Sequence, residues 1–166
     1  MWEPDEIRLL RWFLRFAGVG ILVPGIIYAI SWTDAVKACS LAIGMPADST
    51  SLIPRILVGF SVGALAMGGV SYIFARYVRI GSVLAIGALT LGSVIHYQWA
   101  VMMHSRLAAL PETLSTAQHA LLKDTILFAA NAQIPHIAKN VVLIGLCAVF
   151  FVLSPRICGN QIQTVS

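Results

Sequence analysis

The sequence predicts an all-α integral membrane protein, an antiparallel bundle of four transmembrane helices with short interfacial helices in its two outer connections. Composition gives the class, because 58% of the 166 residues are hydrophobic, only 11% are charged and the mean hydropathy is +0.85. Such a chain cannot cover a water-soluble surface with polar groups. Two long apolar runs, 56–75 and 80–103, flank a short basic turn at 76–79. About 20 apolar helical residues span the hydrocarbon core, so the runs predict two antiparallel neighbouring spans.

The first predicted span covers residues 12–32. Arg8, Arg11 and Arg15 recur at helical spacing around its start, which is typical of arginine side chains that extend to the headgroup level. Pro24 removes a backbone hydrogen bond in the middle of the span, so we expect a kink there.

A polar connection leads from the first span to the second. Residues 34–43 have helical periodicity and end at Gly44, which predicts a short interfacial helix with Thr33 as its N-cap. The second span is predicted at 54–75, because Pro54 suits a first helical position.

Small residues four positions apart recur in the second span and in the third, which is predicted at 80–103. This spacing lets two helix backbones approach closely, which is how helices associate in lipid. We therefore expect the two arms of the hairpin to pack through these residues. The pairs are Gly59 with Gly63, Ala64 with Gly68, Gly81 with Ala85, and Ala88 with Gly92.

The last connection and the last span complete a single membrane domain, residues 1–166. Ser115 and Gln118 have the spacing of a capping box, so residues 115–130 predict a second interfacial helix. The fourth span is predicted at 135–153. Lys139 lies about a turn inside its start, where a lysine side chain still reaches water.

The basic residues predict the orientation of the chain. One side of the membrane would hold Arg76 and Arg79 in a very short turn, together with the arginines near both ends of the chain. Positive charge in short loops favours the cytoplasmic side, so we expect both termini there, in a bacterial inner membrane. The net charge of +4 is small and the basic residues flank apolar runs. This pattern predicts contact with lipid headgroups and argues against nucleic acid.

The sequence contains no pattern typical of a catalytic or metal centre. Cys39, Cys147 and Cys158 include no CxxC pair, so neither a disulfide framework nor a redox motif is predicted. There is no Ser/His/Asp constellation, no phosphate-binding glycine loop and no histidine pair with metal-ligand spacing. We therefore predict no metal site and expect no catalysis by this chain alone.

The four histidines all fall between His96 and His136. In the predicted topology these two residues lie near the same membrane surface and could face each other across neighbouring helices. Neutral imidazole binds haem and chlorophyll-type pigments, so this pair is a candidate cofactor site. The alternative is that both are interfacial histidines, hydrogen-bonded to backbone, water or headgroups.

Polar-tipped aromatic residues follow directly after His96. Histidine, tyrosine and glutamine side chains can hydrogen-bond the oxygens of a quinone headgroup beside an apolar slot for its tail. His96, Tyr97 and Gln98 therefore form a second candidate site, for a quinone. The alternative is an ordinary aromatic belt at the membrane surface.

Several of these features together resemble the DoxX-like family of small membrane proteins. The likeness covers most of the chain and includes the arginine-rich segment 8–11, the segment 42–46, the basic turn 76–79 and the segment 138–145 with its Lys-Asn pair. The founding member of that family is a small subunit of a thiosulfate:quinone oxidoreductase. Family members commonly carry a glutamate in the second span, whereas 56–75 has no acidic residue. The resemblance therefore implies no role for an intramembrane carboxylate in this chain.

The function that we expect is a non-catalytic accessory subunit of a larger membrane complex, one that carries out electron transfer. Its partners would be lipids and other integral membrane subunits. The alternative is a quinone-interacting subunit similar to that of thiosulfate:quinone oxidoreductase. A transporter or channel is a third class, but the spans have neither an acidic residue nor a clear polar stripe.

Overall fold

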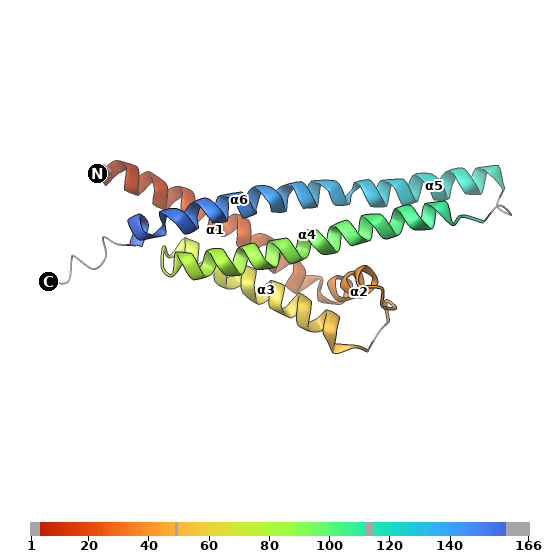
Figure 1. Cartoon of the computed structure of the whole chain (residues 1–166), viewed down its shortest axis with the longest axis horizontal. Coiled ribbons are helices and arrows are strands. Elements are labelled where there is room, and N and C mark those ends of the chain that lie inside the picture. Colours follow the sequence, from red (N-terminus) through yellow and green to blue (C-terminus); the bar gives the residue numbers. More distant parts are fainter. Residues whose placement is uncertain (1–3, 49, 112–114, 159–166) are drawn as a thin grey trace.

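The computed structural model describes residues 4–48, 50–111 and 115–158, and its regular structure there is helical. Figure 1 shows α1 and α4 running from the end where α1 begins and α6 ends, and α3 and α6 running back toward it. We call that end the terminal end and the opposite one the far end. The helices are α1 (Pro4–Ile30), α2 (Trp32–Ala42), α3 (Leu52–Ile73), α4 (Val78–Ala108), α5 (Thr116–Asn131) and α6 (Gln133–Cys158).

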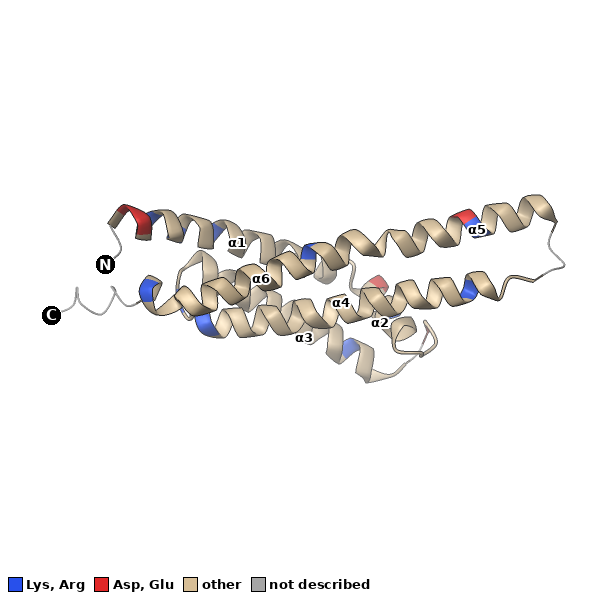
Figure 2. Cartoon of the chain, turned by 45° about the horizontal axis from the view of Figure 1, so that its top comes forward, with Lys and Arg blue, Asp and Glu red and all other residues tan. Residues whose placement is uncertain are grey.

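In the part of the chain that the structure describes, four helical segments are long and apolar enough to cross a membrane, and they indicate an integral membrane protein. They are α1, α3, α4 and the continuous run Thr116–Cys158. Figure 2 shows long uncharged stretches of α3 and α4, with charged residues at their ends. An uncharged middle is what a helix needs in hydrocarbon, because an unpaired charge there is costly.

Helix boundaries follow the sequence signals with a few differences. α1 continues through Pro24 without a break. α2 begins at Trp32 behind Ser31, whose side chain makes no capping bond, so the predicted N-cap at Thr33 is wrong. The predicted capping box at Ser115 is present at the start of α5.

The helices approach most closely at glycines in the terminal half. A Cβ on Gly69 would lie 2.8 Å from the carbonyl oxygen of Gly18, so α1 and α3 touch backbone to backbone there. A Cβ on Gly68 would lie 3.0 Å from the carbonyl oxygen of Gly81 on α4. The predicted packing of the hairpin through small residues is therefore confirmed at Gly68. Gly63 has nothing within 4 Å of such a Cβ, so it takes no part.

A polar pair is enclosed in the same half of the bundle. The hydroxyl groups of Tyr72 on α3 and Ser82 on α4 are 2.6 Å apart, and the ring of Tyr72 meets Phe150 of α6 edge to face at 5.4 Å. Nearby, Asn140 on α6 donates to the carbonyl oxygen of Leu89 at 3.4 Å. These hydrogen bonds satisfy polar groups that have no access to water.

The far end differs most from the sequence-based expectation. The sequence predicts that residues 115–130 lie along the membrane surface, but α5 runs nearly in line with α6 and packs along the second half of α4 (Figure 1). The reason that α5 continues the direction of α6 is the backbone at the junction between them. Ala132 between the two helices has α-helical dihedral angles, and Pro135 stands close enough to the start of α6 for the helix direction to continue.

Candidate functional site

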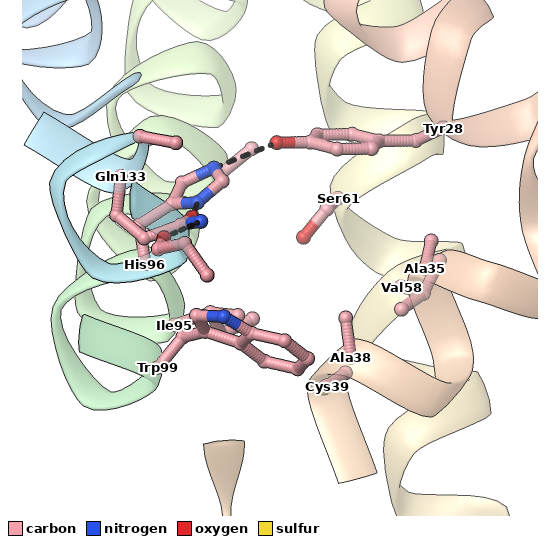
Figure 3. A pocket seen from close by; sticks show the side chains of 14 residues that line it. Tyr28, Ala35, Ala38, Cys39, Val58, Ser61, Ile95, His96, Trp99 and Gln133 are labelled. Carbon is pink, nitrogen blue, oxygen red and sulfur yellow. Dashed lines mark hydrogen bonds between the residues drawn. The ribbon is translucent and has the colours of Figure 1, made fainter. Parts of the chain in front are cut away.

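A pocket of about 360 Å³ opens where α3 diverges from α4 in the far half of the bundle. Its size lies near the lower end of the range for small-molecule sites, which is roughly 300–1,000 Å³. Most of its wall is carbon. Tyr28, His96 and Gln133 form a hydrogen-bonded group, and Ser61 lies apart from it (Figure 3). The lining residues are Tyr28, Ala35, Ala38, Cys39, Val58, Ser61, Ala88, Gly92, Ile95, His96, Trp99, Ala129, Ala132 and Gln133.

The polar side is a chain of hydrogen bonds that joins α1, α4 and α6. The hydroxyl of Tyr28 lies 3.3 Å from Nε2 of His96, and Nδ1 of His96 lies 2.7 Å from Oε1 of Gln133. The amide nitrogen of Gln133 donates to the carbonyl oxygen of Ala129 at 3.1 Å, which fixes the orientation of the amide. Because Oε1 can only accept, the proton of neutral His96 is on Nδ1. Nε2 is then an acceptor, and the Tyr28 hydroxyl donates to it.

Other side chains shape the rest of the pocket. Tyr28 and Trp99 enter from opposite sides, and the hydroxyl of Ser61 lies between them (Figure 3). Ser61 donates to the carbonyl oxygen of Leu57 at 2.9 Å, so its remaining lone pairs are available as acceptors. Cys39 of α2 closes one wall. Burial raises the pKa of its thiol, so it is protonated at neutral pH.

The structure brings together two of the four predicted site residues. The rings of His96 and His136 stack with centroids 4.8 Å apart and planes 9° from parallel. Tyr97 is 60% exposed and Gln98 is also exposed, so both lie on the outer side of α4. The remaining two histidines, His104 and His119, are exposed on α4 and α5 and do not join the pocket.

Sequence reasoning missed the partners of His96 that come from other helices. Residues on one face of a helix are three or four positions apart, so this spacing predicts Trp99 beside His96 in place of Tyr97. No local pattern identifies Tyr28 and Gln133, because α1 and α6 bring them to His96 only in the folded chain.

The arrangement fits some of the expected cofactors better than others. Stacked imidazoles present ring faces to each other, so His96 and His136 cannot hold a haem iron between their nitrogens. In the described ranges, no three His, Cys, Asp or Glu side chains are grouped to hold a metal ion. A quinone-type ring needs hydrogen bonds from a few polar groups beside an apolar cavity, and the pocket offers both.

Comparisons with protein-family models, curated proteins and solved structures found no match to this chain. The resemblance to the DoxX-like family therefore stays a prediction from the sequence segments given above. Any proposal about function therefore depends on the geometry of the pocket.

Proposed function

We propose that this chain is an integral membrane subunit that binds a quinone-type ligand and has no catalytic centre of its own. In this proposal α1, α3, α4 and α6 cross the bacterial inner membrane as an antiparallel bundle, with the terminal end on the cytoplasmic side. A helix rises 1.5 Å per residue, so His96 lies about 26 Å along α4 from Arg79. With a hydrocarbon core of about 30 Å, the pocket then lies within the core, near its far surface.

The observation that supports this proposal is a group of hydrogen-bonding side chains along one side of a largely apolar pocket. A quinone has two oxygens on a ring and an apolar tail, so it needs one polar wall and a slot of carbon. Tyr28 and His96 supply the polar wall, and the remaining lining residues supply the slot. Trp99 offers an aromatic face for the ring.

The hydrogen-bond roles indicate how each redox form of the ligand would bind. A quinone carbonyl oxygen would accept from the Tyr28 hydroxyl, whose bond to His96 is long at 3.3 Å. A quinol hydroxyl would donate to Nε2 of His96 once Tyr28 moves aside. Gln133 keeps the proton on Nδ1 in both cases.

The test is binding of a short-chain quinone analogue to the purified full-length protein in detergent, measured by quenching of tryptophan fluorescence. His96→Ala should weaken binding about tenfold or more, because it removes the ring that positions the Tyr28 hydroxyl at the pocket and the Nε2 acceptor for the reduced form. Gln98→Ala, two residues away on the exposed face, is the matched control and should bind as the wild type does. Equal affinity of wild type and His96→Ala would contradict the proposal.

A second candidate is an accessory role in a larger complex, which exposed apolar residues on α5 favour. Leu121 is 69% exposed and Phe128 is 78% exposed, on a helix that extends beside α4 past the ends of α1 and α3 (Figure 1). Purification from native membranes in mild detergent tests this role. We expect a stoichiometric complex that Leu121→Ser with Phe128→Ser disrupts and that Leu52→Ser, an equally exposed control on α3, leaves intact. A chain that purifies alone would remove this candidate.

A further inference from the structure

We propose that the terminal end of the bundle binds the phosphate group of an anionic lipid. The site is an open groove of about 620 Å³ between the turn at 75–77, the first residues of α4 and the end of α6. It lies at the opposite end of the bundle from the quinone pocket. This inference does not depend on quinone binding, but it rests on the membrane orientation proposed above.

Two arginines line the groove, and one of them is held in a fixed position. Nε of Arg79 donates to the hydroxyl of Ser154 at 3.0 Å, and the guanidinium lies 5.7 Å from the ring centre of Phe151. Arg76 lies over the ring of Tyr77 at 5.9 Å. Within the described residues, no carboxylate lies at ion-pair distance from either arginine. Each guanidinium therefore keeps free donors, in a geometry that suits phosphate oxygens.

The start of α4 adds backbone N–H donors beside these arginines. α4 begins at Val78 without a side-chain cap, in contrast to the starts of α3 and α5. The first N–H groups of such a helix and the positive end of its dipole favour an anion. Ala75 and Tyr77 both have left-handed dihedral angles, with φ of 51° and 53°. Backbone strain of this kind in residues other than glycine is typical of ligand clamps.

The surroundings of the groove favour a lipid as the source of the phosphate. Phe74 is 67% exposed and Tyr77 is 70% exposed beside it, as expected of aromatic residues at the level of the headgroups. Basic pockets between transmembrane helices on the cytoplasmic side bind anionic headgroups. Free phosphate shares the chemistry of the headgroup but would not use the apolar side chains nearby.

Native mass spectrometry of the full-length protein in detergent tests the site, with phosphatidylglycerol and phosphatidylcholine supplied in equal amounts. We expect the wild type to retain phosphatidylglycerol in preference. Arg76→Gln and Arg79→Gln should each lower that affinity roughly fivefold, since a basic group near an anionic headgroup contributes about that much. Arg106→Gln, at the far end of α4, is the matched control and should have no effect.

Two further measurements test whether the phosphate belongs to a lipid and whether the groove is the site that binds it. If millimolar inorganic phosphate displaces the lipid, the site binds phosphate from either source, and if it does not, the ligand is the lipid. Ser154→Ala keeps both charges but frees Arg79, so it should lower the preference for phosphatidylglycerol even if the arginine variants fail to fold. Equal retention of both lipids by the wild type, or unchanged preference in Ser154→Ala and both arginine variants, would overturn the proposal.

Discussion

The two halves of the bundle use the same helices in different ways. In the terminal half, α1 and α3 meet at Gly18 and Gly69, where the backbones themselves are in contact. In the far half, α1 and α4 are joined by a hydrogen bond between the tips of two long side chains, the hydroxyl of Tyr28 and the ring of His96. The first contact leaves no space, whereas the second leaves a pocket of about 360 Å³.

The two contacts differ in the size of the side chains that form them, and the pocket lies beside the contact formed by the larger side chains. Small residues let backbones approach, and dispersion contacts then stabilise the helix pair. In the far half, the side chains of Tyr28 and His96 instead reach across from α1 and α4 to form a hydrogen bond. The two halves should therefore respond differently to matched substitutions.

The largest expected effect is on the backbone contact of the terminal half. In Gly69→Ala the new Cβ would lie 2.8 Å from the carbonyl oxygen of Gly18, so the helices must separate, at a cost of about 1–3 kcal/mol. Gly63→Ala adds the same methyl group on the same helix where nothing lies within 4 Å. It should be neutral or slightly stabilising, because alanine is the better helix former. Unfolding in mixed micelles, followed by circular dichroism, gives both free energies, and equal values would refute this account of the packing.

A smaller difference is expected between the two tyrosines. Tyr72→Phe removes a buried hydrogen bond of 2.6 Å to Ser82 and should lower the free energy of unfolding by about 0.6–1.7 kcal/mol. Tyr28→Phe removes a weaker bond of 3.3 Å, so the same unfolding measurement should show almost no change. The effect of Tyr28→Phe should appear instead as weaker binding of a quinone analogue. The comparison fails if Tyr28→Phe proves the more destabilising of the two.

The smallest effect is a rate difference between two buried thiols. Cys39 lines the pocket and Cys147 belongs to the packed half. Burial raises the pKa of Cys39, so less thiolate is present at pH 7–8 and maleimide should react more slowly than with a free thiol. The rate should climb as the pH rises above the ordinary range of a cysteine, about 8.5.

A quinone analogue in the pocket should slow the labelling of Cys39 further, while Cys147 should stay unlabelled in the native protein. Mass spectrometry of the labelled peptides measures both rates, and Cys39→Ser identifies the signal. Labelling of Cys147 before Cys39 would show that the far half is not the more open one.

The sequence predicts the helices well because long uncharged runs and capping residues act locally. It identifies the capping box at Ser115 and the role of Gly68, which depend on nearest neighbours. The sequence predicts only part of the pocket. Adjacent residues of a helix point about 100° apart, so His96 faces the pocket while Tyr97 faces outward. The contribution of Tyr28 depends on how α1 crosses its neighbours, which no local pattern encodes.

The short turn at 74–77 between α3 and α4 also orders the assembly of the molecule during its synthesis. The Gly68–Gly81 contact joins neighbouring parts of the chain, so this hairpin can form as soon as α4 has been made. The bond between His96 and Gln133 spans 37 positions and cannot form until the start of α6 has been made. A nascent chain therefore forms the α3–α4 hairpin before the pocket is complete, and a chain shortened before α6 would reach the membrane without Gln133, the partner of His96.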